Sequence, residues 1–373
     1  MGEMIPQGHG MGTGMARDGK GRLDDSSRSE MLDYLDRCKT MVQGEFRRLF
    51  KGARWRNPVV SSLYDAALDY PLRGGKALRP ALCLLSCGAA GGAERDALNS
   101  AVAIELFHNG FLIKDDLMDH SEYRRGLPTL HRKYWPEFAL DVGDALNVLS
   151  MRPLFQNLET IGAYRSLLVF TEIQRMAQQS VEGQAMELTW IRANTWDLEF
   201  RDYYEMARRK TCWYTCAAPV RIGTIVGLKR LRSDYLDAAT RFAMNLGIGF
   251  QIEDDLLNLV GSRKKYGKEI LGDIWEGKRT IMLIHLLQNA RSSDRRRILQ
   301  ILHKPRSQKR ASEILYILDR MNTYGSLQVG RAVKRRFARK ALSILESECG
   351  WMPDARMKGL LVSLARYATD REL

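Results

Sequence analysis

The sequence predicts an all-α protein, and three observations support this prediction. Only 10 of the 373 residues are proline, and most of them lie at segment edges, as Pro58, Pro128 and Pro353 do, where helices commonly begin or end. No run of alternating β-branched residues is bounded by turn pairs, so strands are not expected. No linker rich in Pro, Gly or Ser interrupts residues 59–290, which favours one large helical domain.

The expected helices follow one another with glycine-containing breaks between them. They cover about residues 30–51, 59–70, 78–90, 95–119, 138–160, 164–189, 198–226, 233–260, 276–291 and 309–324. The breaks fall at Gly74-Gly75, at Gly91-Gly92, at 125–128 and at 261–267.

The two ends of the chain differ from its middle. Residues 1–30 contain no apolar block and are rich in Gly and polar residues, which predicts a disordered extension and argues against a signal peptide. Residues 31–373 are expected to form a single domain whose motifs lie in 60–290. The remaining part, 291–373, holds 19 Lys and Arg against 8 Asp and Glu, a net +11 of the chain's formal +14.

The basic C-terminal part is interpreted first as a solvated helical surface. The run from Arg331 to Lys340 is predicted to form an amphipathic helix, with Val333 and Phe337 among cationic residues. A weak contact with an anionic membrane through 291–345 is the alternative. Nucleic acid is not expected as a partner, because no recognition motif or aromatic interleaving occurs. No apolar stretch is long enough to span a membrane, and six cysteines without an export signal indicate a cytoplasmic protein.

Two acidic clusters carry the first chemical signal. Asp115 and Asp119 are four residues apart at the end of an apolar helix, so both carboxylates face the same side, with Asp116 beside them. Aligned carboxylates repel one another unless cations bridge them, and oxygen-only ligands suit Mg²⁺. The second cluster also ends an apolar helix and places four polar residues on one face: Gln251, Asp254, Asp255 and Asn258. One acidic triplet is usually solvated surface, but two such clusters predict a bundle whose cavity has a metal-binding mouth.

Basic segments on glycine turns accompany the two clusters. One is Gly-Gly-Lys-Ala-Leu-Arg-Pro at 74–80, another includes Arg124 and Arg125 within 123–131, and a third spans 267–280. Carboxylates that hold Mg²⁺ on one side and Lys and Arg on the other form a suitable site for a diphosphate.

Together these motifs resemble the trans-isoprenyl diphosphate synthases, or polyprenyl synthetases, and among them the geranylgeranyl diphosphate synthases. The resemblance covers about residues 60–290 and rests on GGKxLRP at 74–80, DDLMD at 115–119, RRGLPTLH at 124–131, Lys-Thr at 210–211 and FQIEDD at 250–255, followed by the lysine-rich run. It implies an isoprenoid-synthase helical bundle around a deep apolar cavity. It also implies a homodimer that condenses isopentenyl diphosphate head-to-tail with dimethylallyl, geranyl or farnesyl diphosphate, with Mg²⁺ as cofactor.

The resemblance also implies roles for individual residues. Mg²⁺ would be held by Asp115, Asp119 and Asp254, with Asp116 as a neighbour and Asp255 acting through water. The allylic diphosphate would be held by Arg124, Lys210, Lys268 and Lys278, and isopentenyl diphosphate by Gly75, Lys76, Arg79, His108 and Arg125. Oxygens of Lys210, Thr211 and Gln251 would face the allylic cation that forms when diphosphate departs.

Three residues depart from the family pattern. Ala77 stands where many relatives carry a further Arg, which thins the basic site. Lys114 could compete with Mg²⁺ beside Asp115 or could point outward. Asn258 replaces the last Asp of the second motif, a form that some geranylgeranyl diphosphate synthases share.

Product length is argued from the helix that precedes the first cluster. Phe111 lies about one turn before Asp115, roughly 5–6 Å away along the axis. In relatives that make farnesyl diphosphate, an aromatic residue one position earlier blocks the growing chain, and here that position is Gly110. We therefore expect a geranylgeranyl product, with a farnesyl or longer-chain synthase as the alternative.

Two alternatives of another class are a terpene cyclase, which needs no isopentenyl diphosphate site, and a non-catalytic partner subunit, which should have lost its acidic clusters.

Overall fold

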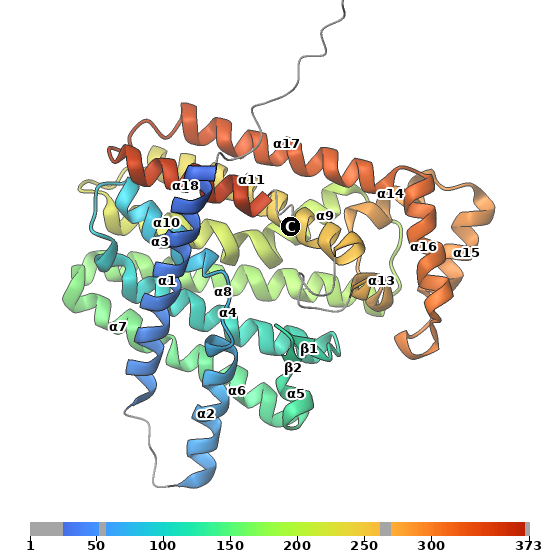
Figure 1. Ribbon diagram of the computed structural model, residues 1–373, viewed down its shortest axis with the longest axis horizontal. Coiled ribbons are helices and arrows are strands. Elements are labelled where there is room, and N and C mark those ends of the chain that lie inside the picture. Colours follow the sequence, from blue (N-terminus) through green and yellow to red (C-terminus); the bar gives the residue numbers. More distant parts are fainter. Residues whose placement is uncertain (1–24, 52–56, 262–269, 370–373) are drawn as a thin grey trace, which may run out of the picture.

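The protein is an almost wholly helical bundle, shown in Figure 1 as a computed structural model that describes residues 25–51, 57–261 and 270–369. The all-α prediction is confirmed. The first half of the chain comprises α1 (Asp25–Lys51), α2 (Pro58–Leu72), α3 (Leu78–Ala89), η1 (Glu94–Ala97), α4 (Leu98–Met118), β1 (Tyr123–Arg124), β2 (Leu127–Pro128), α5 (Leu130–Lys133), α6 (Pro136–Leu149), α7 (Met151–Thr160) and α8 (Gly162–Arg192). The second half comprises α9 (Phe200–Ala207), the π-helix η2 (Arg208–Ala217), α10 (Ala218–Gly227), α11 (Ser233–Val260), α13 (Gly272–Glu276), α14 (Ile281–Asn289), α15 (Ser292–Leu302), η3 (Arg306–Gln308), α16 (Ala311–Thr323), α17 (Ser326–Ser347) and α18 (Ala355–Thr369).

Helix α4 lies at the centre of the bundle. Every residue from Ser100 to Gly110 is buried, because α3, α6 and α7 pack around the helix. A helix that is apolar on all sides is stable only when it is enclosed in this way. Helix α11 is enclosed similarly by α17, η2 and α10. The two acidic clusters lie at the C-terminal ends of these two enclosed helices, so the bundle core fixes their positions.

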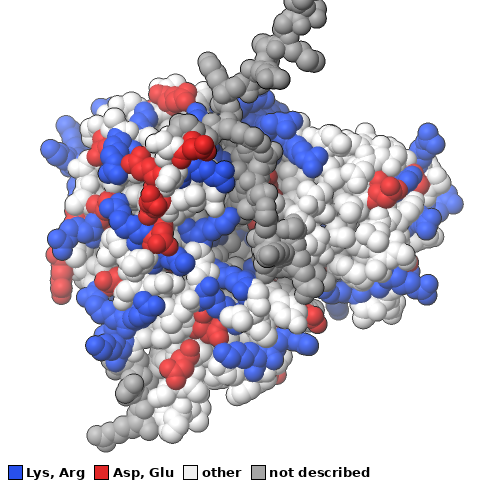
Figure 2. Space-filling view, viewed as in Figure 1, with Lys and Arg blue, Asp and Glu red and all other residues white. Residues whose placement is uncertain are grey.

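The basic C-terminal part is an integral part of this bundle. Apolar side chains of α15, α16 and α17 pack with those of α11 and α14 in one buried cluster. Val333 and Phe337 belong to this packing, so α17 is amphipathic as the sequence predicts. Its outer face carries exposed Arg335, Arg336 and Arg339. Figure 2 shows that Lys and Arg side chains spread over the visible face, and that acidic side chains lie among them on the left.

Helix α1 begins earlier than the sequence predicts. Residues 25–30, assigned to a disordered extension, form its first turns, and the rest of that extension lies outside the described residues. Met31 and Tyr34 are buried immediately after these turns, and Glu30 forms an ion pair with Arg356 of α18 at 2.9 Å. These contacts hold α1 against the bundle from Glu30 onward.

Three other segments also differ from the prediction. The single helix expected over 138–160 is two helices, α6 and α7. The single helix expected over 198–226 is divided by the π-helix η2. A short hairpin, β1–β2, occurs where only a break was expected. Its two-residue turn places Arg125 and Gly126 at positive φ (54° and 77°), a geometry that suits the twist of paired strands. None of the helices in the described ranges is long and apolar enough to cross a membrane.

Candidate active site

The two acidic clusters face one another across a cavity of about 760 Å³. Its walls come from the ends of α4 and α11, from α8 and η2, and from α13 with the segment that follows it. The predicted residues that line it are Asp115, Asp119, Arg124, Lys210, Thr211, Gln251, Asp254, Asp255 and Lys278. The helical core therefore brings together groups that are up to 163 positions apart in the sequence.

The first cluster presents two carboxylates to this cavity. Asp119 is buried and accepts a hydrogen bond from the ammonium of Lys278 at 2.7 Å. Burial raises the pKa of Asp119 to about 7, against the lowering effect of Lys278. Asp115 is more exposed and lies 3.4 Å from Nζ of Lys210. Because burial disfavours a bare carboxylate, this pair is stabilised by any further cation that enters the cavity.

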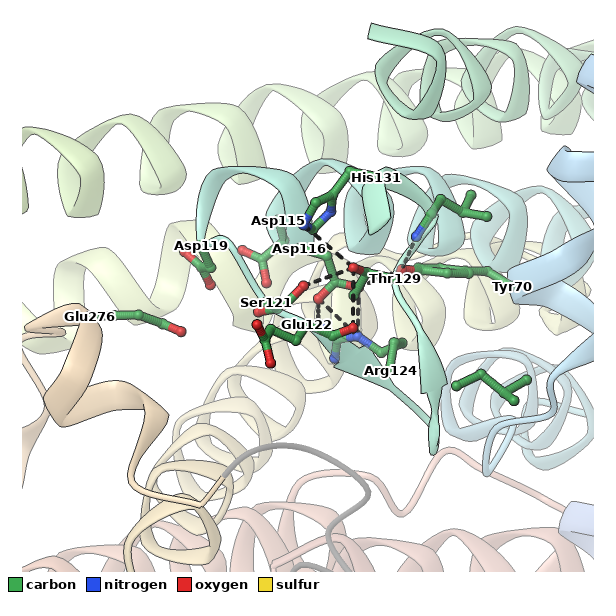
Figure 3. A network of polar contacts seen from close by, with 12 residues as sticks. Tyr70, Asp115, Asp116, Asp119, Ser121, Glu122, Arg124, Thr129, His131 and Glu276 are labelled. Atoms are coloured by element: carbon green, nitrogen blue, oxygen red, sulfur yellow. Dashed lines mark hydrogen bonds and ion pairs between the residues drawn. The ribbon is translucent and has the colours of Figure 1, made fainter. Parts of the chain in front are cut away.

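Asp116 points away from the cavity, contrary to the expectation that it neighbours the metal. Its carboxylate accepts two hydrogen bonds from Nε of Arg124, at 2.9 and 3.1 Å, one more from Nη2 of Arg124, and one from the hydroxyl of Tyr70 at 2.8 Å. Figure 3 shows Asp116 turned toward Arg124 and the hairpin, whereas Asp119 faces Glu276. Neighbouring residues on a helix point about 100° apart, so Asp116 cannot share the direction of Asp115. Asp116 instead fixes Arg124, which does line the cavity.

The second cluster is joined to η2 by a chain of hydrogen bonds. Thr211 donates to Oε1 of Gln251 at 2.6 Å, and Nε2 of Gln251 donates to Asp255 at 2.7 Å. The hydroxyl of Tyr203 donates to the other oxygen of Asp255 at 2.8 Å. Burial raises the pKa of Asp255 to about 7. The chain fixes the orientation of the Gln251 amide at the cavity wall, and Asp254 lines the cavity beside it.

Lys210 is held where α8 and η2 approach one another closely. A Cβ at Gly183 would lie 2.1 Å from the backbone nitrogen of Lys210, so only glycine allows this approach. Nζ of Lys210 lies 2.5 Å from Glu187, one turn after Gly183 on α8, and 3.4 Å from Asp115. Glu187 was missed in the sequence, because a single glutamate on a long polar helix gives no signal of its own.

Lys278 lies among carboxylates on the opposite side of the cavity. Its ammonium contacts Asp119 at 2.7 Å, Glu276 at 2.9 Å and Asp273 at 3.8 Å. Asn258, which departs from the family pattern, supports this group because its side-chain oxygen accepts a hydrogen bond from the backbone N–H of Asp273 at 3.0 Å. Lys268, the other lysine predicted in this run, lies outside the described residues.

The residues predicted to bind isopentenyl diphosphate form a second, smaller pocket of about 100 Å³. All five line it: Gly75, Lys76, Arg79, His108 and Arg125. A Cβ at Gly75 would lie 2.8 Å from Nη2 of Arg125, so glycine is needed for the arginine to reach this position. Ala77 lines the same pocket, and none of the described residues places a further cation there. Within the described part of the chain, this pocket therefore combines three cationic side chains with one histidine.

Tyr214 lies between the two pockets. It lines the larger cavity, and its ring stacks on that of His108 with 5.8 Å between centroids. The guanidinium of Arg79 lies 4.6 Å from the same ring, within the range of a cation–π contact. Arg79 also contacts Nε2 of His108 at 3.1 Å and donates to Thr215 at 2.8 Å. One aromatic side chain thus separates the carboxylate-lined cavity from the cationic pocket.

Two further residues of the smaller pocket were missed in the sequence. Glu105 is buried within the pocket, and burial raises its pKa against the opposing charges of Arg79 and Arg125. Tyr367 of α18 lies with its ring centroid 5.2 Å from Nζ of Lys76. Glu105 stands inside an apolar helix, where a lone carboxylate could have been noted. Tyr367 gave no signal, because it lies far outside the motifs.

The structure contradicts the role assigned to Gly110. A Cβ there would meet Oδ1 of Asn147 at 2.6 Å and the carbonyl oxygen of Gly143 at 2.9 Å, both on α6. Gly110 therefore allows α4 and α6 to pack closely and opens no space for a product. Phe111 faces the other way, and its ring meets that of Tyr214 at 5.9 Å. Lys114 also points away from the cavity, toward Asp144 on α6 at 2.5 Å.

Comparisons with known proteins agree with the motifs and the geometry. The geranylgeranyl diphosphate synthase of Saccharolobus solfataricus is 33% identical over 303 residues, which cover 76% of this chain and 88% of that protein. The geranylfarnesyl diphosphate synthase of Aeropyrum pernix is 34% identical over 83% of this chain and 94% of its own length. The crystal structure of geranylgeranyl pyrophosphate synthetase from Pyrococcus horikoshii has a TM-score of 0.80 at 30% identity and covers 92% of this chain and 99% of its own. Because the sequence model of the polyprenyl synthetase family also matches residues 61–320, the chain belongs to the polyprenyl synthetase family.

Proposed function

We propose that this protein is a Mg²⁺-dependent prenyltransferase that condenses isopentenyl diphosphate with an allylic diphosphate to make geranylgeranyl diphosphate. One observation carries the proposal: Tyr214, which lines the carboxylate-lined cavity, stacks on His108, which lines the cationic pocket, so the two sites are one ring contact apart. A reaction in which the double bond of one diphosphate displaces the diphosphate group of another needs one site for each diphosphate and a shared apolar boundary. The names of the relatives support the product class.

The donor set of the larger cavity fits Mg²⁺. The groups available from Asp115, Asp119 and Asp254 are all carboxylate oxygens, which are hard ligands suited to this ion. No group of three acidic, histidine or cysteine side chains within the described residues is close enough to hold an ion alone. Mg²⁺ is commonly bound by one or two carboxylates together with substrate phosphate oxygens and water. The bound ions would neutralise the departing diphosphate.

The side chains have distinct tasks in this reaction. Lys210 and Arg124 hold the allylic diphosphate, while Lys76, Arg79 and Arg125 hold isopentenyl diphosphate. The bond between the allylic carbon and the diphosphate oxygen breaks, and the double bond of isopentenyl diphosphate forms the new carbon–carbon bond. The released diphosphate takes the proton that is then lost, so no protein base is required. The assembled cationic pocket supports this reaction over a terpene cyclase, and the retained acidic clusters argue against a non-catalytic subunit.

Product length is the first test of the proposal. Purified enzyme incubated with Mg²⁺, isopentenyl diphosphate and each allylic primer should accumulate the C20 diphosphate, measured by chromatography of the dephosphorylated alcohols. Phe111→Ala should shift the product to C25 or longer, because it removes the ring that abuts Tyr214. Phe200→Ala, which removes a partly buried ring on α9, should leave the product unchanged. A farnesyl product from the unaltered enzyme would refute the chain length.

We also propose a homodimer formed through α6, α7 and α8. These helices carry a set of exposed large apolar side chains: Leu140, Val148, Met151, Phe155, Leu158, Tyr164, Leu167 and Val181. Helix α7 packs against both α6 and α8, and exposed apolar side chains gathered on neighbouring helices are typical of protein interfaces. Phe155→Glu with Leu167→Glu should therefore yield a monomer by light scattering after size exclusion. Leu315→Glu, at an exposed leucine on α16, should not, and a dimer that survives both interface changes would exclude this face.

The compartment and the basic surface complete the proposal. All six cysteines are buried thiols, which supports a reducing compartment such as the cytoplasm. The exposed cations of α17 remain available for a weak contact with anionic lipid in the region 291–345.

A further inference from the structure

We infer that Lys309, in the basic C-terminal part, is a positioning residue for the group of Asp119, Glu276 and Lys278 at the cavity. It acts by holding the C-terminal end of the short helix α13. The inference rests on the proposed function, because it assigns a role in the same cavity. It also gives a specific task to one cation of a segment that lies outside the catalytic motifs.

Helix α13 is too short to hold itself in place. It has five residues, and left-handed residues flank it on both sides, Leu271 at φ 65° and Gly277 at φ 74°. The last carbonyls of a helix lack partners within the helix and need donors from elsewhere. Yet α13 carries Asp273 and Glu276, and Lys278 follows it, so its placement decides where three charged groups of the cavity lie.

Lys309 and Arg279 provide donors to these carbonyls. Nζ of Lys309 donates to the carbonyl oxygen of Trp275 at 2.6 Å and to that of Ile274 at 3.3 Å. Nη1 of Arg279 donates to the carbonyl oxygen of Gly277, and its guanidinium lies 3.8 Å from the ring centroid of Trp196. A cation at the C-terminal end of a helix is also favoured by the helix dipole. The two side chains thus provide donors at the C-terminal end of α13, and of the two only Arg279 is among the described residues that line the cavity.

The burial of Lys309 argues against an incidental contact. Its exposed fraction is only 8%, and Arg279 and Arg306 lie near it with the same charge. Burial and then these two arginines lower the pKa of Lys309 to about 8, with Glu276 acting in the opposite direction. A buried cation is costly unless it is well paired. Here the carbonyls of α13 provide that pairing, so Lys309 and α13 hold one another.

The connection from Lys309 to the catalytic cavity is short. Glu276, the last residue of α13, lies 3.2 Å from Arg306 on one side and 2.9 Å from Lys278 on the other. Lys278 in turn contacts Asp119 at 2.7 Å, and Figure 3 shows Glu276 facing Asp119. The segment before α16 therefore holds α13 twice, through its backbone by Lys309 and through Glu276 by Arg306. A shift of α13 would move Lys278 away from Asp119.

The test compares Lys309→Met with Lys309→Arg and with Lys340→Met, a change at an exposed lysine of α17. Lys309→Met keeps the length of the side chain but removes its donors. We expect kcat to fall about 10–100-fold, the range typical of residues that orient metal-site groups. The KM for isopentenyl diphosphate should stay within about twofold, since no residue of α13 is among the described residues that line the smaller pocket. Lys309→Arg should recover most of the loss, and Lys340→Met should have no effect.

A second readout is independent of turnover. Binding of inorganic pyrophosphate in the presence of Mg²⁺, measured by isothermal titration calorimetry, should weaken about tenfold in Lys309→Met and not in Lys340→Met. The inference is overturned if Lys309→Met binds pyrophosphate normally, or if it loses only thermal stability. If the unaltered enzyme makes no prenyl product, the proposed function fails instead. The pyrophosphate titration would still decide whether Lys309 positions the cavity.

Discussion

Asp115→Ala should reduce kcat by about 10³-fold while leaving the fold intact. The carboxylate of Asp115 faces the cavity and is partly exposed, with Lys210 at 3.4 Å as its neighbour. Removing it takes away one of the proposed Mg²⁺ ligands and with it much of the stabilisation of the departing diphosphate, and losses of roughly 10²–10³-fold are usual for one such electrostatic contact. Lys210 keeps Glu187 at 2.5 Å, so no buried cation is left unpaired. Steady-state kinetics at saturating Mg²⁺, together with thermal unfolding, would measure both effects.

Asp116→Ala provides the matched control, because it removes the same group one position further along α4. Asp116 is fully buried and holds Arg124 and Tyr70. Breaking a buried pair by removing one partner typically costs about 3–5 kcal/mol. We therefore expect a large fall in the free energy of unfolding for Asp116→Ala and a small one for Asp115→Ala. Full activity in Asp115→Ala would remove Asp115 from the proposed metal site.

Arg125→Gln should raise the KM for isopentenyl diphosphate by about 10–150-fold. This corresponds to the roughly 1.5–3 kcal/mol that a hydrogen bond to a charged group contributes. Arg125 lines the smaller pocket beside Gly75 and donates to the backbone carbonyl of Tyr70 at 2.9 Å. A guanidinium is well suited to two oxygens of a diphosphate. The KM for the allylic substrate should change little, because the described residues that line the larger cavity do not include Arg125.

The separation of the two KM values is the informative part of this experiment. Arg132→Gln removes an arginine that is 60% exposed on α5, close in sequence to Arg125, and should leave both values unchanged. If Arg125→Gln raised the KM of both substrates equally, the two pockets could not be assigned to different diphosphates. A variant with unchanged kinetics would remove Arg125 from the isopentenyl diphosphate site.

The fold and the family could be predicted from the sequence because they depend on patterns that lie along the chain. Apolar periodicity marked the helices, and the spacing of Asp115 and Asp119 placed two carboxylates on one face. The grouping of Lys76, Arg79 and Arg125 followed from the family resemblance, and the structure brings these three residues into one pocket. Their roles in binding and catalysis stay predictions until the variants are measured.

What the sequence could not show depends on which neighbour each residue faces. Asp116 belongs to the same motif as Asp115, but its contacts come from Tyr70 and Arg124. Gly110 suggested open space, but whether a glycine faces a cavity or another helix depends on the packing of α6. Lys309 stood in a basic run that could be interpreted only as surface, and its burial follows from the position of α13.

The π-helix η2 has a consequence for how this enzyme can change over time. A π-helical segment accommodates an extra residue within an otherwise α-helical stretch. Deleting one residue from 208–217 would restore ordinary winding, with about 100° between successive residues, and would change the directions of the side chains within the segment relative to one another. Lys210 could then not face the cavity while Tyr214 and Thr215 kept their contacts with Arg79. We therefore expect single-residue deletions within 208–217 to be lost from a deep mutational library, including deletions at positions that face neither pocket.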